Sequence, residues 1–291
     1  MDGLICHQKV TKNILVAHGD LDGIISAVLV IRKFGLPLGE TEVVFVQPFT
    51  VNEVVIPCEA EKVYVVDVAV NNRDPEMTRT FISRIGGRLV WWFDHHQGWA
   101  VEIIGKNPAF VIDAEAGSCA EVIGGEPELV ADAIAADTRK GELSERAQLV
   151  ERAMKANMSD DDIRWLAVRW LLGDESARDG LEEVAKKYAR IQAETERLAA
   201  TYQVIGGVAL VDARESNHQY DLTQLLLAGQ EQASFAVVQT VHPRHGEGLT
   251  IATSRKDVNL VELFGLASGA PFRVSVQADR MEEVLAKLET V

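Results

Sequence analysis

The first part of the chain alternates short runs of β-branched and aromatic residues with segments that have the apolar periodicity of a helix. The strand-like runs are residues 13–17, 42–46, 62–66 and 88–93, and the helix-like segments are residues 23–34 and 75–85. Parallel strands need crossover connections, usually helices, and a sheet covered on both faces can have strands that are apolar throughout. The alternation therefore predicts an α/β fold with a mostly parallel sheet flanked by helices.

Acidic residues and histidines follow the ends of three predicted strands. They are His18, Asp20 and Asp22 after the first, Asp67 after the third, and Asp94, His95 and His96 at the end of the fourth. Loops at the carboxyl ends of parallel strands converge on one crevice. We therefore expect one edge of the sheet to gather these side chains. Asp137, which ends a helix-like stretch beginning near Glu128, is a further candidate.

The remainder of the chain reads differently. Residues 127–172 are expected to be helical, and residues 176–202 form a long charged helix with apolar residues at near-helical spacing. Beyond it, strands are predicted at 207–211, 234–241, 249–253 and 272–276, helices at 222–229, 258–264 and 280–288, and a hairpin loop at 242–248. The predicted domains are residues 1–175, a helical linker at 176–202, and a smaller α+β domain at 203–291.

Composition limits the classes of partner. The chain has 291 residues, 47% of them hydrophobic, and a formal net charge of −15. This charge repels long nucleic acids and favours small phosphate-bearing substrates. Cys6, Cys58 and Cys119 lack the spacing of a zinc site or a disulfide framework. No run approaches the ~20 apolar residues of a membrane span, and no signal peptide is recognisable, so we expect a cytoplasmic protein without membrane partners.

Carboxylates and imidazoles without thiolates suit Mn²⁺, Mg²⁺, Fe²⁺ or Zn²⁺. Two such ions roughly 3.5–4 Å apart, sharing one carboxylate, would relieve the mutual repulsion of the acids and supply a water-derived nucleophile for attack on phosphorus. Taken alone, Asp67 or Asp137 is more typical of a turn or helix cap. The adjacent histidines after Asp94, together with Asp20-x-Asp22, favour a metal site.

Four short motifs, taken in their order along the chain, resemble those of a known family. His18-Gly-Asp20-Leu-Asp22-Gly, Val-Val-Asp67-Val, Asp94-His95-His96, and Ala-Gly-Ser118-Cys-Ala-Glu followed by Asp137-Thr resemble the motifs of the DHH phosphoesterase superfamily. The resemblance extends over residues 1–175. The superfamily includes RecJ-like and oligoribonuclease-like members. It implies a metal-dependent phosphoryl hydrolase with two divalent cations, of which Mn²⁺ is the expected ion.

The resemblance also implies roles for individual residues. The metal ligands would be His18, Asp20 and Asp67 for one ion, and Asp22, Asp67, His95 and Asp137 for the other. Asp67 would bridge the two ions, His96 would face the scissile phosphate, and Asp94 would orient a histidine. His18 lies two residues before Asp20, whereas many members that hydrolyse oligonucleotides place this histidine four residues before the Asp-x-Asp.

The C-terminal part resembles the DHHA1-type domain that usually accompanies this family, in a divergent form. Where relatives carry Gly-Gly-Gly-His, residues 266–273 read Leu-Ala-Ser-Gly-Ala-Pro-Phe-Arg. Gly269 keeps some backbone freedom there, while Pro271 removes an amide donor. Arg255, Lys256 and Arg273 are the candidates for substrate binding, with a solvated surface charge as the alternative.

The favoured function is therefore a metal-dependent phosphodiesterase, or nuclease, that hydrolyses short oligonucleotides, dinucleotides or a related small phosphoester. A polyphosphate or pyrophosphate hydrolase is the alternative within the enzyme class. A non-catalytic nucleotide-binding regulatory protein is the alternative outside it. The sequence leaves the substrate and a homodimeric state open.

Overall fold

The computed structural model describes residues 11–71, 74–99, 105, 107–157, 160–242, 246–266 and 271–291. The chain divides into two compact units, Met1–Lys186 and Lys187–Val291. The division falls within helix α8 (Ser176–Ala199), which occupies most of the predicted linker. The domain limits at residues 175 and 203 stay predictions. Within the described residues, no helix is long and apolar enough to cross a membrane.

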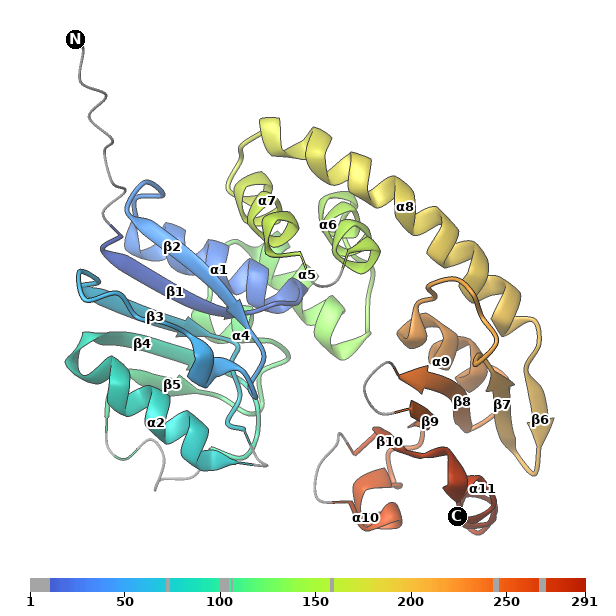
Figure 1. The fold of residues 1–291 in the computed structure, drawn as a ribbon. Coiled ribbons are helices and arrows are strands. Elements are labelled where there is room, and N and C mark those ends of the chain that lie inside the picture. The colour runs from blue at the N-terminus through green and yellow to red at the C-terminus, as the bar shows by residue number, and fades with distance from the viewer. Residues whose placement is uncertain are drawn as a thin grey trace. The chain divides into compact units, whose positions relative to one another are not determined.

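The first unit contains a five-stranded sheet in the order β2-β1-β3-β4-β5, and every adjacent pair is parallel (Figure 1). Its strands are β1 (Asn13–His18), β2 (Thr41–Val46), β3 (Lys62–Val66), β4 (Leu89–Asp94) and β5 (Phe110–Ile112). Its helices are α1 (Leu21–Phe34), α2 (Pro75–Ile85), α4 (Cys119–Ile123), α5 (Pro127–Thr138), α6 (Glu145–Ala156) and α7 (Asp161–Leu171), and α8 begins in this unit. The predicted α/β class is confirmed. The prediction did not include β5 and α4, and it gave α5, α6 and α7 as one helical region.

Both faces of this sheet are covered, which explains why its strands are largely apolar. Leu15 and Ala17 of β1 pack on one side in a core shared with α1 and the helices from α4 to α8. Ile14 and Val16 pack on the other side with Phe81 of α2. Adjacent residues of one strand thus serve two separate cores.

Strand order reverses at β1, because the chain passes from β1 to β2 on one side and then to β3 on the other. In an open parallel sheet such a reversal leaves a crevice at the carboxyl ends of the strands. The helix after β1 begins at this edge, so its N-terminus also faces the crevice. The topology thus provides a ligand site where the sequence places its acids and histidines.

The second unit has a mixed five-stranded sheet in the order β10-β9-β8-β7-β6, in which only β7 and β8 are parallel. The strands are β6 (Gln203–Ile205), β7 (Val208–Asp212), β8 (Phe235–His242), β9 (Gly246–Thr253) and β10 (Arg273–Gln277). The helices are α9 (Leu222–Gln230), α10 (Leu260–Phe264) and α11 (Met281–Glu289). The predicted α+β character is confirmed, with β6 as an unpredicted edge strand. The hairpin tip at 243–245 and residues 267–270 of the divergent loop, including Gly269, lie outside the described residues.

Candidate metal centre

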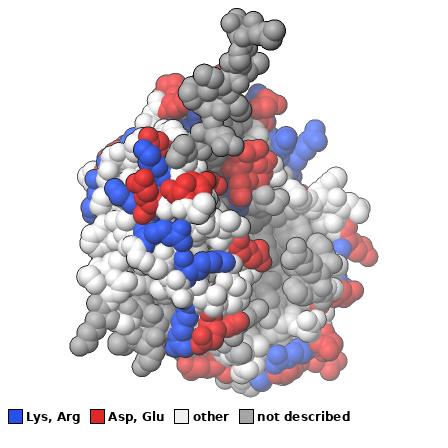
Figure 2. Space-filling view, turned by 60° about the vertical axis from the view of Figure 1, so that its left-hand side comes forward, with Lys and Arg blue, Asp and Glu red and all other residues white. Residues whose placement is uncertain are grey.

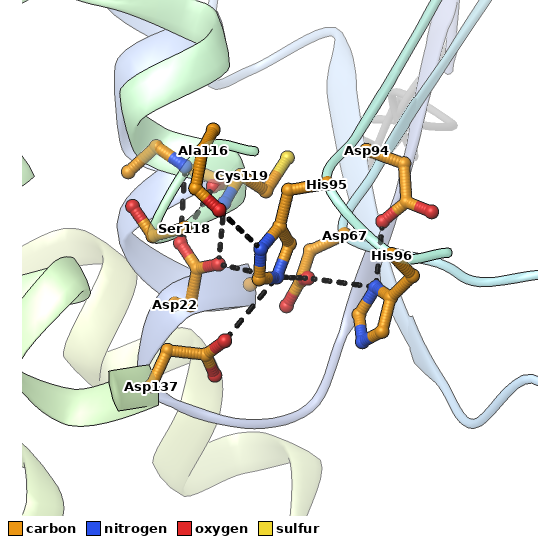
Figure 3. Close-up of polar contacts among 12 residues, drawn as sticks. Asp22, Asp67, Asp94, His95, His96, Ala116, Ser118, Cys119 and Asp137 are labelled. Atoms are coloured by element: carbon orange, nitrogen blue, oxygen red, sulfur yellow. Dashed lines mark hydrogen bonds and ion pairs between the residues drawn. The ribbon is translucent and has the colours of Figure 1, made fainter. Parts of the chain in front are cut away.

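Three parallel strands deliver the predicted residues to one edge of the sheet. His18 is the last residue of β1, Asp67 directly follows β3, and Asp94 ends β4 with both histidines immediately after it. Asp20 is the N-cap of α1, where its Oδ1 accepts a hydrogen bond from the amide of Gly23 at 3.0 Å. Asp137 comes from the last turn of α5, and Figure 3 shows it pointing toward His95.

Glycine is required at position 23 for a steric reason. A Cβ atom built there would lie 2.2 Å from the carbonyl oxygen of His18, a distance that no side chain can adopt. The first turn of α1 can therefore approach the end of β1 only because residue 23 lacks a side chain. This approach sets the spacing between His18 and Asp20, the N-cap of the helix.

The structure brings the predicted metal ligands, together with His96, into three overlapping groups. Within each group the ligand atoms lie within 4.8 Å of one another, and the groups are His18–Asp20–Asp67, Asp22–His95–Asp137 and Asp67–His95–His96. His18 Nδ1 lies 2.9 Å from Asp20 Oδ2 and 3.6 Å from Asp67 Oδ2. His95 Nε2 lies 3.7, 3.6 and 3.2 Å from carboxylate oxygens of Asp22, Asp67 and Asp137. Asp67 is thus common to both predicted sites.

Asp67 has an unusual backbone conformation. Its φ is 57°, which few residues other than glycine adopt, and its side chain is buried, with 2% exposed. Its amide donates to the carbonyl oxygen of Phe93 at 3.0 Å, which ties the turn after β3 to the end of β4. A strained backbone at this point is typical of a functional residue that the surrounding structure holds in place.

Hydrogen-bond donors hold two other acids in place. Both oxygens of buried Asp22 accept amide hydrogen bonds from the first turn of α4, at 2.7 Å from Cys119 and 3.1 Å from Ala120. Buried Asp94 accepts from Trp99 Nε1 at 2.6 Å and from His96 Nδ1 at 2.8 Å. These contacts fix the direction of each carboxylate, and Asp94 in turn orients the ring of His96.

The protonation of the site reflects crowded negative charge. Burial raises the pKa of Asp22 well above its usual range, and the nearby charges of Asp67 and Asp20 raise it further. Burial opposes protonation of His18 and His95, yet the surrounding carboxylates outweigh it and raise their pKa values to about 12 and about 9. The centre therefore attracts positive charge.

A divalent cation fits this donor set. Among the described residues, Asp67 Oδ1 and His95 Nε2 are buried side-chain atoms without a hydrogen-bond partner, and they lie 3.6 Å apart. A buried polar atom without a partner destabilises a folded protein unless water or an ion satisfies it. Carboxylate oxygens suit Mn²⁺ and Mg²⁺, and imidazole nitrogens suit transition-metal ions, so the donor set fits a divalent cation such as Mn²⁺.

The predicted substrate-binding cations lie in the second unit. Arg255 pairs with Asp257 through Nε at 3.1 Å and Nη2 at 2.5 Å, and its guanidinium lies 6.0 Å from the ring centroid of Phe235. Arg273 donates to Thr223 Oγ1 at 3.2 Å, and Lys256 is exposed. Their roles stay predictions.

Two residues that support the centre were not predicted from the sequence: Gln47 contacts His18, and Arg164 of α7 donates from Nε to the carbonyl oxygen of Gly19 at 2.8 Å. Gln47 had a signal, because it directly follows β2 at the same sheet edge. Trp99 lies close to Asp94 in the sequence and was expected to stack on a base or to pack, whereas its indole donates to Asp94. Arg164 lies 145 positions from Gly19, a separation that only the folded chain reveals.

No protein-family model matches this chain, and no curated protein matches its sequence. Its fold matches that of the pGpG-specific phosphodiesterase PggH of Vibrio cholerae, at 15% identity and a TM-score of 0.69, over 96% of this chain and 98% of that one. It also matches RecJ from Thermus thermophilus in complex with Mn²⁺, at 16% identity and a TM-score of 0.61, over 96% of this chain and 52% of RecJ.

A third likeness names the domain itself. The DHH domain of PF0399, from a family of ribosomal proteins, matches at 13% identity and a TM-score of 0.51, over 96% of this chain and 86% of that one. Together these likenesses show that this chain shares its fold with PggH, RecJ and the DHH domain of PF0399. The resemblance drawn from the four motifs is thereby confirmed at the level of the fold. PggH is matched over nearly its whole length, whereas this chain spans about half of the Thermus RecJ.

Proposed function

We propose that this protein is a divalent-metal-dependent phosphodiesterase acting on short oligonucleotides, dinucleotides or a related small phosphoester. The observation that carries the proposal is the position of buried Asp67, whose carboxylate oxygens lie 3.6 Å from Nδ1 of His18 and 3.6 Å from Nε2 of His95 at the carboxyl ends of β1, β3 and β4. A shared carboxylate between two sets of imidazole and carboxylate donors is the arrangement expected of a two-metal phosphoryl hydrolase. PggH and RecJ, which have the same fold, are a phosphodiesterase and an exonuclease.

Each side chain of the centre has a proposed role in binding the cations or the substrate. His18, Asp20 and Asp67 would hold one cation, and Asp22, Asp67, His95 and Asp137 the other. Bound cations of this kind lower the pKa of water and offset charge on phosphate oxygens. Nδ1 of His96 donates a hydrogen bond to Asp94, which leaves Nε2 of His96 to contact an oxygen of the scissile phosphate. The side chain of His96 is 41% exposed and is therefore accessible to a substrate.

The negative net charge of the chain favours small substrates over long nucleic acids. Acidic and basic side chains lie interspersed over the described residues of the face that Figure 2 shows, and the net charge of the chain is −15. A long polyanion would have to overcome this repulsion along its length. We therefore propose short nucleotides as the substrates. We propose Mn²⁺ as the cation because the RecJ structure with the same fold is a complex with Mn²⁺.

The test is a hydrolysis screen with Mn²⁺ or with chelator present. The panel holds a linear dinucleotide, an RNA 5-mer, a longer single-stranded DNA, a cyclic dinucleotide, pyrophosphate and polyphosphate. Asp67→Asn is the inactive variant and Asp279→Asn, at an exposed site in the second unit, is the matched control. We expect Mn²⁺-dependent turnover of the short nucleotides that only Asp67→Asn abolishes.

Other outcomes assign the alternatives. Turnover of pyrophosphate or polyphosphate alone would make the protein an inorganic phosphohydrolase. Nucleotide binding without turnover of any substrate would make it a regulatory binder. Full activity of Asp67→Asn would refute the shared-ligand mechanism.

A further inference from the structure

Gln47 lies beside the metal centre and belongs to none of the four motifs. It directly follows β2, and a tight turn fixes its backbone: the amide of Thr50 donates to the carbonyl oxygen of Gln47 at 2.9 Å, and the amide of Gln47 donates to Thr50 Oγ1 at 3.0 Å. From this turn, the side-chain oxygen Oε1 lies 3.0 Å from Nε2 of His18. The contact joins the ends of two adjacent parallel strands.

The contact determines which nitrogen of His18 can bind a cation. An amide oxygen only accepts hydrogen bonds, so the imidazole must carry its proton on Nε2. In a neutral ring the lone pair is then on Nδ1. Nδ1 is the atom that lies 2.9 Å from Asp20 and 3.6 Å from Asp67.

We propose that Gln47 is a positioning residue that selects Nδ1 of His18 as the ligand atom. The proposal rests on the metal centre proposed above and concerns one of its two cations. It also gives a physical reason for the short spacing between His18 and Asp20. Nδ1 is closer to the backbone than Nε2, so a histidine at the very end of β1 reaches the N-cap acid of α1 through Nδ1 while Gln47 holds the far nitrogen.

His95 provides the internal comparison. Its Nδ1 lies 3.3 Å from the carbonyl oxygen of Ala116, so that nitrogen carries the proton and Nε2 faces the carboxylates. The two histidines thus present opposite nitrogens to the centre. His95 is fixed by a main-chain carbonyl that substitution cannot remove, whereas His18 is fixed by a side chain that can be changed.

The test compares Gln47→Leu, which keeps the size but removes the acceptor, with Gln47→Glu, which keeps an acceptor. Gln192→Leu, at an exposed glutamine of α8, is the control. Titration with Mn²⁺ measures the number and affinity of bound ions. Metal ligands whose orienting hydrogen bond is lost typically bind about 10–100-fold more weakly. We expect a loss of this size for one of two ions in Gln47→Leu, and near wild-type binding in Gln47→Glu and Gln192→Leu.

A second readout identifies the ligand atom directly. In Zn²⁺-loaded, ¹⁵N-histidine-labelled protein, the ¹⁵N shifts report which nitrogen of His18 is protonated. We expect a protonated Nε2 in the wild type. Coordination through Nε2, or unchanged affinity for both ions in Gln47→Leu, would overturn the role of Gln47 while leaving the centre intact. Absence of metal binding by the wild type would instead overturn the proposed function.

Discussion

Asp67→Asn should uncouple the stability of the first unit from Mn²⁺. Asparagine has nearly the same shape and tolerates a positive φ better than most residues, so it can adopt the 57° that this position requires. It is a weaker cation ligand, and it removes one charge from a centre in which burial and neighbouring acids already raise the pKa of Asp22 and Asp137. This relief is offset by the lost attraction between Asp67 and the imidazoles of His18 and His95, whose pKa values Asp67 helps to raise, so without metal the variant should be about as stable as the wild type.

The magnitude follows from mass action. A ligand present at 100 times its Kd stabilises the folded state by about 2.7 kcal/mol per site, so two sites supply about 5 kcal/mol. For a domain of about 150–250 residues, each kcal/mol shifts the Tm by about 2–4 °C. Mn²⁺ at that concentration should therefore raise the Tm of the wild type by about 10–20 °C.

Differential scanning calorimetry, with and without Mn²⁺, is the assay. Titration of the wild type fixes the ion concentration at 100 times Kd, and Asp279→Asn should respond to Mn²⁺ as the wild type does. We expect Asp67→Asn to show less than half of the wild-type shift, because both ions lose their common ligand. A full wild-type shift in Asp67→Asn would refute the bridging role.

Three further predictions concern other parts of the molecule. Gly23→Ala should destabilise the first unit by more than about 2 kcal/mol in denaturant titration, since its Cβ would meet a carbonyl oxygen at 2.2 Å, whereas Gly39→Ala, with open space around it, should be nearly neutral. Arg197 lowers the pKa of Glu194 to about 2. The ionised carboxylate therefore stabilises the fold above its ordinary pKa of 4.5 and loses that contribution as the pH falls toward 2. The free energy of unfolding of Glu194→Gln should depend less on pH between 4.5 and 2 than that of the wild type. Asp94→Asn should lower kcat at least about tenfold with little change in KM, because it weakens the bond that orients an imidazole; a change in KM alone would contradict this.

The sequence predicted the sheet and the location of the centre because both depend on local patterns. Apolar runs mark the strands, and an acid or histidine directly after a strand must lie at its carboxyl end. His18, Asp67 and His95 could therefore be placed at one edge before any contact was known. The three-residue strands β5 and β6 were too short to give a pattern of their own, and their pairing to longer neighbours defines them.

Other features depend on contacts between distant segments. The positive φ of Asp67 has no sequence signal, since a glycine or asparagine would be the usual residue there. The bond from Arg164 to Gly19 and the amides that hold Asp22 come from helices far along the chain. These interactions arise only when the sheet and its helices have packed.

The acids of the centre differ in what satisfies them, and this difference links folding to function. Asp22 accepts two main-chain amide bonds, and Asp94 accepts from an indole and an imidazole, so protein donors compensate for their burial. Oδ1 of Asp67 has no hydrogen-bond partner among the described residues, although its side chain is almost completely buried. A buried acceptor without a hydrogen-bond partner thus lies on the carboxylate that both proposed cations would share. A cation bound there would satisfy this oxygen, which is why the same substitution is expected to remove both catalysis and metal-dependent stability.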